Sequence, residues 1–372
     1  MNPLTNIKNI YFIGIGGIGM SALARYFNTQ GVHVSGYDKT PTVLTDDLVK
    51  EGIKIHFEDD LNQMDKAATV IVYTPAIPAD HGELNYYRDH GYNVVKRSDV
   101  LQWVTENAFT IGIAGTHGKT TTTSMTAHIL RHTEYGCNAF LGGIASNYNT
   151  NFWSHEKNVV VVEADEYDRS FLKLSPNIAV ITAVDPDHLD IYGDKSAIEA
   201  SFREFADKVS DKTKIFIPKG LPLEGISCAI NEDAYFSAFN IRISNSQYVF
   251  DVKTPSETLE NIAFGLPGKH NLMNALMALA MAKTFGLTNE DIASALSSFK
   301  GIKRRFSYQI KSEKLVYIDD YAHHPTEINA VHQAVRELYP NQKVLAIFQP
   351  HLFSRTKDFA DDFAKSLAAF DE

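Results

Sequence analysis

The chain has 372 residues, of which 44% are hydrophobic and 22% are charged, and its formal net charge is −10. This length exceeds one ordinary domain and suits two or three domains, each able to bury its own core. The negative charge argues against a general binder of nucleic acid or of a membrane surface, because the partner's phosphates would be repelled except at local basic sites. A small anionic ligand in a focused site is compatible with this charge.

Two further properties bear on the compartment and on metal binding. The N-terminal apolar run lacks a basic leader and is interrupted by glycines, and no other apolar run reaches the roughly 18 residues of a membrane span. We therefore expect a cytoplasmic protein. The cysteines, Cys137 and Cys228, lie far apart without metal-like spacing, so we expect two small buried residues rather than a disulfide or a zinc site.

Apolar runs with β-branched residues alternate with helix-like segments along the chain. Short runs that end in Gly, Asp, His or Pro before a helical pattern are typical of parallel α/β sheets, whose strand carboxyl ends carry the ligands. The sequence therefore predicts an α/β fold. The predicted strands are IYFIGIGG, ATVIVYTPA, FTIGIAGTHGK, VVVVEADE, IAVITAVD, LVYIDDY and VLAIFQP.

The chain divides into three predicted domains, at residues 1–107, 108–300 and 301–372. The second domain begins where a strand leads into the THGK loop, and the third follows the amphipathic segment NLMNALMALAMAKTFGL and the basic stretch GIKRRF. Residues 215–265 are polar and β-rich, which predicts peripheral strands of the second domain.

The first predicted strand ends in a glycine-rich turn, Gly14-Ile15-Gly16-Gly17-Ile18-Gly19, which is followed by Met20, Ser21 and a helical pattern. Such a turn lets the backbone approach a diphosphate at a helix N-terminus. Asp38 follows a second apolar stretch, about where a ribose-binding acid would lie in a dinucleotide fold. Any nucleotide diphosphate, or a purely structural turn, is compatible with this pattern.

A second phosphate site is indicated by Gly115-Thr116-His117-Gly118-Lys119-Thr120, with Thr121 next in a threonine run. A Walker A loop has four residues between its glycines, and the position that would complete it holds Ile113. The compact loop still offers backbone N–H groups, a lysine for the β- and γ-phosphates and a hydroxyl for Mg²⁺. We expect it to bind ATP.

Acidic residues and a histidine follow the next two predicted strands. Glu163 ends one strand, with further carboxylates at Asp165, Glu166 and Asp168, which suits a hard cation with oxygen ligands. A solvated acidic loop is the alternative. His188 lies in DPDHLD at the end of the following strand, and it is either a ligand at the same sheet edge or a core histidine.

Seven motifs in order resemble those of the cytoplasmic Mur ligases of bacterial peptidoglycan synthesis. The resemblance implies a Rossmann-like N-terminal domain, a P-loop ATPase-type central domain and a Rossmann-like C-terminal domain. After AAFDE the family usually continues, so we expect the third domain to be incomplete in this sequence. The motifs are GIGGIGMS, GTHGKTTT, EADEYD, DHLD, GKHNLMNALMALA, DDYAHHPTE and FQPHLFSRT.

The resemblance also implies the reaction. L-alanine would be joined to UDP-N-acetylmuramate through an acyl phosphate made from ATP, with Mg²⁺, by a monomer or weak homodimer. Lys119 would hold the phosphates, Thr120 and Glu163 one Mg²⁺, and His188 a second, so Lys119, Glu163 and His188 would be the catalytic residues. The residues implied for the UDP sugar are Gly14, Gly16, Gly17, Ile18, Gly19, Ser21 and Asp38.

Other residues are assigned by resemblance alone. Asn274 resembles a contact of the adenine ring, Asp320 a contact of the nucleotide ribose, and an arginine at Arg304 or Arg305 one that reaches the nucleotide. The wall of the amino-acid site would comprise Tyr321, His323, His324 and Arg355, of which Arg355 would grip the carboxylate.

Three alternatives stay open at this point. A recycling ligase that adds a murein tripeptide to the same sugar would share all the nucleotide motifs. A nicotinamide oxidoreductase would explain the glycine turn and Asp38 but would leave the THGK loop and Glu163 without a purpose. A catalytically silent nucleotide-binding protein would explain a shortened third domain.

Overall fold

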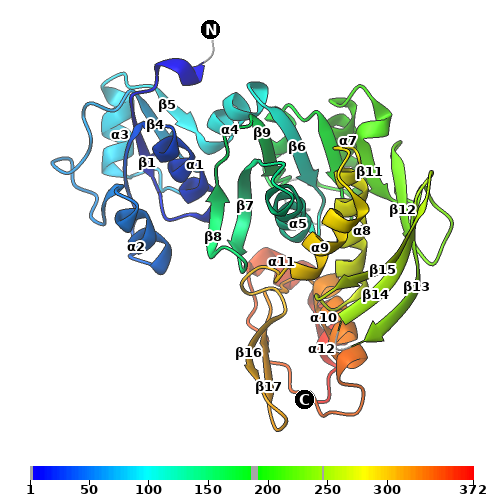
Figure 1. The fold of residues 1–372 in the computed structure, drawn as a ribbon. Coiled ribbons are helices and arrows are strands. Elements are labelled where there is room, and N and C mark those ends of the chain that lie inside the picture. Colours follow the sequence, from blue (N-terminus) through cyan, green and yellow to red (C-terminus); the bar gives the residue numbers. More distant parts are fainter. Residues whose placement is uncertain (1–2, 186–191, 245–246) are drawn as a thin grey trace.

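The computed structural model describes residues 3–185, 192–244 and 247–372 (Figure 1). His188, together with Asp187 and Asp190, therefore lies outside the described residues. The described residues form two parallel-sheet units, an N-terminal and a central one, and a smaller C-terminal region made mainly of helices. This agrees with the α/β fold predicted from the alternating apolar runs.

The N-terminal unit has a five-stranded parallel sheet in the order β3-β2-β1-β4-β5. Its chain order reverses beside β1, and in open parallel sheets the ligand crevice lies at such a switch point. The glycine turn follows β1 at this position. The strands are β1 Asn9–Ile13, β2 His33–Tyr37, β3 Lys54–His56, β4 Val70–Tyr73 and β5 Val94–Lys96. The helices are η1 Pro3–Asn6, α1 Ile18–Thr29, α2 Val43–Lys50, α3 Gly82–Asp89 and α4 Arg97–Glu106.

The central unit has a ten-stranded sheet in the order β15-β14-β13-β12-β11-β10-β6-β9-β7-β8. Its inner strands run parallel, and antiparallel pairs occupy both ends. The strands predicted over 215–265 are β11 to β15 at one end, so their peripheral position is confirmed. The strands are β6 Phe109–Ala114, β7 Asn138–Ala145, β8 Thr150–Trp153, β9 Val159–Glu163, β10 Ile178–Ile181, β11 Ile215–Pro218, β12 Ile226–Ile230, β13 Phe236–Ser244, β14 Gln247–Lys253 and β15 Thr258–Phe264.

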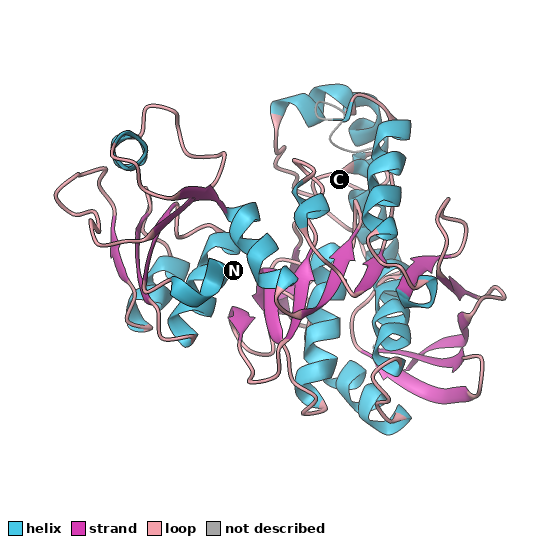
Figure 2. Cartoon of the chain, turned by 90° about the horizontal axis from the view of Figure 1, so that it is seen from above, coloured by secondary structure: helices cyan, strands magenta, loops and turns pink. Residues whose placement is uncertain are grey.

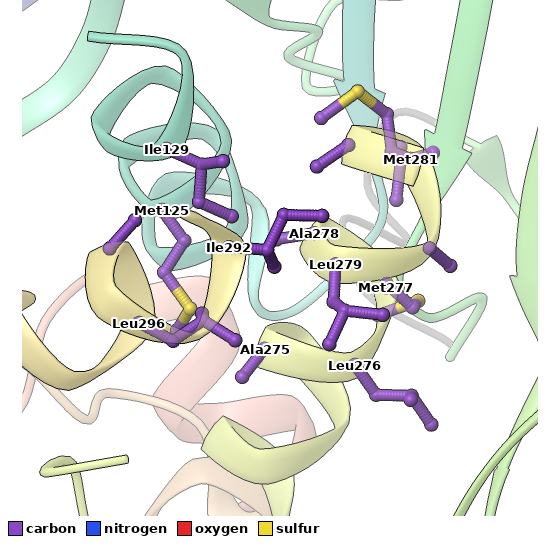
Figure 3. Close-up of a cluster of buried hydrophobic side chains, with 14 of the residues drawn as sticks. Met125, Ile129, Ala275, Leu276, Met277, Ala278, Leu279, Met281, Ile292 and Leu296 are labelled. Atoms are coloured by element: carbon purple, nitrogen blue, oxygen red, sulfur yellow. The ribbon is translucent and has the colours of Figure 1, made fainter. Parts of the chain in front are cut away.

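Helices cover both faces of the central sheet (Figure 2). Successive strand residues point to opposite faces, so Val161 packs in one buried cluster and Val160 and Val162 in the other. Phe202 and Phe205 of α7 bury one face. The other face packs on α5, α8 and α9, whose side chains meet in Figure 3. The helices are α5 Lys119–His132, η2 Ser170–Lys173, α7 Lys195–Asp207, η3 Lys212–Lys214, α8 Lys269–Lys283 and α9 Asn289–Ser298.

Helix α8 is buried along almost its whole circumference. Its residues from Asn271 to Ala282 are buried except the partly exposed Met273, as expected for a helix that is apolar on all sides. The segment predicted to be amphipathic therefore lies in the core of the central unit. Cys137 and Cys228 are also buried and free, as predicted.

The C-terminal region contains an antiparallel pair, β16 Ser307–Lys311 with β17 Val316–Asp319, and the helices α10 Pro325–Leu338, α11 Phe353–Asp358 and α12 Ala360–Leu367. The strand predicted for VLAIFQP is wrong, because residues 344–350 have no strand partner. The amides of Val344 and Ala346 donate instead to Asp371 Oδ2 and Glu372 O, each at 2.8 Å. An apolar run becomes a strand only when a neighbouring strand offers its free edge.

The three parts are joined by contacts as well as by sequence. Helix α1 packs on β7 and β8, and α10 packs on α8. The linker after α9 pairs with the end of β7, since Lys303 N donates to Ile144 O at 2.9 Å and Ser146 N donates to Gly301 O at 2.9 Å. In the described part of the chain, no helix is long and apolar enough to cross a membrane.

Candidate functional site

The glycine turn after β1 is held by the neighbouring strand β2. The amides of Gly14 and Ile15 donate to the carbonyl of Tyr37 at 2.7 and 3.0 Å, and the amide of Gly16 donates to Asp38 Oδ2 at 2.7 Å. Gly17 caps α1 without a side-chain hydrogen bond, which leaves the first turn of this helix open to a ligand. In this structure the carboxylate of Asp38 therefore supports the turn.

The compact phosphate loop joins β6 to α5 through two glycines with left-handed backbone. Gly115 and Gly118 have φ values of 139° and 82°, which side chains with a Cβ rarely adopt. The loop is bonded to the end of β10, since Thr116 N donates to Ala183 O at 3.0 Å and the hydroxyl of Thr182 donates to the carbonyl of His117. The loop shape is therefore set without a bound nucleotide.

Lys119 begins α5 and lies inside this loop. Its Nζ donates to Gly115 O at 2.7 Å and to the buried carboxylate of Glu166 at 2.8 Å. Burial lowers the pKa of the Lys119 ammonium, but the carboxylates of Glu166, Asp165 and Glu163 outweigh this effect and hold the pKa above its ordinary value. The lysine is charged and ordered at the position where phosphates would enter.

Glu163 ends β9 beside the same helix. Its Oε1 accepts the hydroxyl of Thr120 at 3.1 Å, while Oε2 is buried and has no hydrogen-bond partner among the described residues. Burial raises the pKa of the Glu163 carboxyl, and Lys119 opposes this. No group of three or more His, Cys, Asp and Glu side chains suited to a metal occurs among the described residues, which leave out His188.

Glu327 on α10 links the C-terminal region to the phosphate loop. Its carboxylate lies 3.6 Å from His117 Nδ1, 3.6 Å from Arg305 Nη1 and 3.3 Å from His323 Nδ1. Burial raises the pKa of this carboxyl, but His117, His323 and Arg305 hold it well below the ordinary range. Glu327 is therefore an ionised carboxylate at the junction of two parts of the chain.

The other residues predicted in the C-terminal region lie around this junction. Both oxygens of Asp320 accept backbone amides, from Phe306 and Ala322 at 2.7 Å. Arg305 lies over the ring of Tyr321 at 5.3 Å. The ring of His324 packs 5.1 Å from that of His117, and its Nδ1 caps α10.

One cavity of about 900 Å³ brings these elements together. It is lined from the N-terminal unit by Ile18 and Gly19, and from α8 by Asn274, which packs against Gly118. Several predicted residues lie outside the lining, namely Gly14, Gly16, Gly17, Ser21, Asp38 and Gly115. The other predicted residues that line it are Thr116, His117, Gly118, Lys119, Thr120, Thr121, Glu163, Arg305, Asp320, Tyr321, His323, His324 and Arg355.

Three family models match the chain in succession. They are the Mur ligase family, catalytic domain over residues 9–108, the Mur ligase middle domain over 113–282, and the Mur ligase, glutamate ligase domain over 304–372. The chain belongs to the Mur ligase family.

Two curated relatives resemble this Mur ligase over nearly its whole length. It is 63% identical over 373 residues to the UDP-N-acetylmuramate--L-alanine ligase of Flavobacterium psychrophilum, covering 99% of this chain and 83% of the relative. It is 57% identical over 378 residues to the protein of the same name from Christiangramia forsetii, covering 100% of this chain and 84% of the relative.

Two solved structures resemble the fold of this Mur ligase. The UDP-N-acetylmuramate-alanine ligase of Thermotoga maritima has a TM-score of 0.84 at 30% identity, covering 98% of this chain and 84% of that chain. The UDP-N-acetylmuramate:L-alanyl-gamma-D-glutamyl-meso-diaminopimelate ligase of Neisseria meningitides has a TM-score of 0.71 at 27% identity, covering 80% of this chain and 100% of that chain.

The residues around Glu163 in this Mur ligase fit a divalent cation. Oε2 of Glu163 is buried without a hydrogen-bond partner in the described part of the chain, and the hydroxyl of Thr120 donates to the other oxygen, Oε1. Oxygen donors of this kind are those that Mg²⁺ prefers. A buried carboxylate oxygen with no partner is costly, and a cation would offset this cost.

Several residues of this Mur ligase cavity escaped the sequence prediction. Arg97 lies against Gly19 and 3.9 Å from Asp165, and the first turn of α8 places His270 in the lining, where desolvation and the nearby Arg305 lower its pKa to about 4. Glu166, outside the lining, was predicted only as one of several carboxylates, and Glu327 entered the prediction only within the motif DDYAHHPTE. The EADEYD and HHPTE motifs contain both residues, but the pairing with Lys119 and His117 depends on contacts between distant segments.

Proposed function

We propose that this Mur ligase joins L-alanine to UDP-N-acetylmuramate in the cytoplasm, with hydrolysis of ATP to ADP and phosphate, in peptidoglycan precursor synthesis. In this proposal residues 1–107 bind the UDP sugar, 108–300 bind ATP, and 301–372 contribute the amino-acid site. The observation that carries the proposal is the single cavity that Gly19, Lys119 and Arg355 line from these three parts. Neither a dehydrogenase nor a passive nucleotide binder requires this convergence.

The phosphate loop supplies the charge stabilisation that the first step requires. Lys119 and the loop amides bind the β- and γ-phosphates, and Asn274 and Arg305 contact the rest of the nucleotide. Thr120 and Glu163 hold Mg²⁺, with His188 as a candidate ligand of a second ion. When bound, Mg²⁺ would neutralise phosphate charge. Lys119 and the loop amides orient the γ-phosphate toward the carboxylate of the sugar's lactoyl group, which attacks it to form an acyl phosphate and release ADP.

The C-terminal region orients the amino acid toward that acyl phosphate. Arg355, which is buried and lines the cavity, pairs with the amino acid's carboxylate, and Tyr321, His323 and His324 form the adjacent wall. Because Tyr321, His323 and His324 directly precede α10, the contact of Glu327 on α10 with His117 holds these three residues beside the phosphate loop. The amino group can then attack the carbonyl carbon with water largely displaced.

The proposal is tested by phosphate release from ATP in the presence of UDP-N-acetylmuramate and either L-alanine or the recycling tripeptide. Release that requires the sugar and alanine together, with the alanine adduct found by mass spectrometry, supports the proposal. A preference for the tripeptide would identify a recycling ligase instead. Nucleotide binding without any acceptor-dependent release would indicate a silent binding protein, with oligomeric state measured in parallel.

A further inference from the structure

The imidazole of His323 lies in the cavity, where the mechanism above uses it only as part of the wall of the amino-acid site. It follows β17 on the loop before α10, its side chain is 21% exposed, and it lines the cavity with Lys119 and Arg355. The proposed reaction needs a proton acceptor, because an α-amino group has a pKa of roughly 7.7 to 8.0 in peptides and is mostly protonated at neutral pH. An ammonium group has no lone pair with which to attack.

Two acceptor groups fix the tautomer of His323. Its Nδ1 lies 2.8 Å from the carbonyl oxygen of Tyr321 and 3.3 Å from Oε2 of Glu327, whose carboxyl is ionised as described above. Neither oxygen can donate, so the single proton of the neutral ring is on Nδ1. Nε2 keeps its lone pair, and it makes no hydrogen bond within the described residues.

Three other histidines line the cavity and are less suited to accept a proton. The ring nitrogens of His117 lie 3.6 Å from the carboxylates of Asp185 and Glu327, on either side. Nδ1 of His324 accepts a backbone N–H as the cap of α10. Burial lowers the pKa of His270 to about 4, which makes it a weak base.

We propose that Nε2 of His323 removes a proton from the ammonium group of the incoming amino acid, and that Glu327 is the positioning residue that sets the tautomer. This inference deepens the proposed function and rests on it. His323 is then a catalytic residue as well as part of the amino-acid site. The contact of Glu327 with His117 also places this base next to the phosphate loop.

The atoms and charges balance in this step. An N–H bond of the ammonium breaks, its proton bonds to Nε2, and the electron pair stays on nitrogen. That pair forms the bond to the carbonyl carbon of the acyl phosphate, and the tetrahedral intermediate then expels phosphate with the electrons of the broken C–O bond. The nitrogen loses a second proton to the departing phosphate, and the imidazolium returns its proton to water.

The surroundings of His323 decide the pH range of the base. Burial lowers the pKa of His323. The carboxylate of Glu327 and the carbonyl of Tyr321 raise this pKa, whereas Arg355 and Arg305 lower it, so the net shift is downward. Base function is therefore present at neutral pH and is lost as the pH falls below the ordinary histidine range. The titratable or charged groups facing the ring are Glu327 on α10, Arg355 on α11, Arg305 on the linker, and Tyr321 and His351 beside it.

The test compares two nucleophiles in the wild-type enzyme and in His323→Asn. L-alanine needs a base, whereas hydroxylamine is unprotonated at neutral pH and traps the acyl phosphate as a hydroxamate without one. His323→Asn is expected to lower kcat with alanine about 100-fold or more, in the range of general-base effects. KM for ATP and the rate of hydroxamate formation should stay close to wild type.

Two further variants sharpen the result. Glu327→Gln removes a charge that raises the pKa of His323, so the acidic limb of the alanine pH profile should move to lower pH. His332→Asn removes another imidazole from α10, where it packs on Phe370, and should leave both reactions unchanged. In His323→Asn the acidic limb should instead follow the amino group of alanine and lie at higher pH than in the wild type.

The possible results distinguish a failure of the proposed ligase function from a failure of the assignment of His323 as the base. A wild-type enzyme without alanine-dependent phosphate release would overturn the proposed function, and this base with it. If the wild type is active and His323→Asn is equally active with alanine, the base assignment alone is wrong. An equal loss with alanine and with hydroxylamine would show a structural role for His323 and would also overturn the assignment.

Discussion

The ammonium group of Lys119 lies 2.8 Å from the buried carboxylate of Glu166. Glu166 does not line the cavity, whereas Lys119 does, so the carboxylate binds the ammonium group from outside the cavity lining. A buried ion pair of this kind contributes little net stability, but the loss of one partner leaves an uncompensated charge. The pair thus holds a cation in place before the nucleotide arrives.

Lys119→Met should lower stability as well as activity. Removing one partner of a buried pair costs about 3 to 5 kcal/mol, and Lys119→Met with Glu166→Gln should recover most of this without recovering turnover. Burial raises the pKa of Glu166 to about 7, against the opposing effect of Lys119. A carboxyl with a raised pKa destabilises the fold as the pH rises, so the single variant should regain stability on acidification.

Urea unfolding of the single and double variants, above and below neutral pH, measures these differences. A double variant as unstable as Lys119→Met would show that the uncompensated charge of the buried Glu166 carboxylate is not the cause.

Gly142→Ala should impair metal binding although it replaces none of the predicted ligands. Gly142 lies on β7, and a Cβ there would collide with Oε2 of Glu163. The carboxylate must then turn away from Thr120, and changes next to a ligand typically cost about 10- to 100-fold in metal affinity. The Mg²⁺ concentration for half-maximal phosphate release should rise accordingly.

Gly265→Ala is the matched control for this prediction, because its added Cβ meets only Gln247, at an ordinary 3.6 Å. An unchanged Mg²⁺ requirement in Gly142→Ala would remove Glu163 from the proposed metal site.

Asn151→Leu should weaken binding of the UDP sugar from outside the cavity. The amide of Asn151, on β8, donates to Ile18 O at 2.6 Å and Ser21 Oγ at 2.9 Å, and accepts from Arg25. These bonds fix the start of α1 against the central sheet. Each buried polar group left without a partner costs about 1 to 3 kcal/mol, so the fold should be weakened as well.

Steady-state kinetics should show a larger rise of KM for UDP-N-acetylmuramate than for ATP in Asn151→Leu. Asn158→Ala changes an exposed asparagine just before β9 and serves as the control. Equal rises for both substrates would mean that Asn151 supports the whole fold rather than the glycine turn.

Arg355→Lys should raise KM for L-alanine selectively. The guanidinium binds a carboxylate with two parallel hydrogen bonds, which an ammonium cannot reproduce. Hydrogen bonds to charged groups are worth about 1.5 to 3 kcal/mol, which corresponds to roughly a 10- to 100-fold change. Arg336→Lys, at the Arg336–Asp371 pair near the surface, should leave KM for alanine unchanged. A similar KM in Arg355→Lys would place the alanine carboxylate elsewhere.

Sequence patterns predicted the parts of the site that depend on neighbouring residues. The glycines of both loops, the lysine at a helix start and Glu163 at a strand end are local signals, because turn and strand geometry follows from adjacent residue types. The peripheral strands of residues 215–265 were predicted for the same reason.

Contacts between distant segments escaped prediction. Glu166 meets Lys119 across 47 positions, and Asn151 meets Ile18 across 133. No local pattern marks either pair. The strand expected at VLAIFQP failed for a related reason, since strand formation depends on a free neighbouring edge as well as on apolar residues.

The most direct test of the account follows the oxygen of the sugar carboxylate. UDP-N-acetylmuramate with a heavy-oxygen label in its lactoyl carboxylate is incubated with ATP and L-alanine, and the released phosphate is analysed by mass spectrometry. Attack of this carboxylate on the γ-phosphate predicts that a labelled oxygen is found in the phosphate, only when the sugar and alanine are both present. Phosphate released without label, or released at the same rate without alanine, would contradict the proposed ligase mechanism.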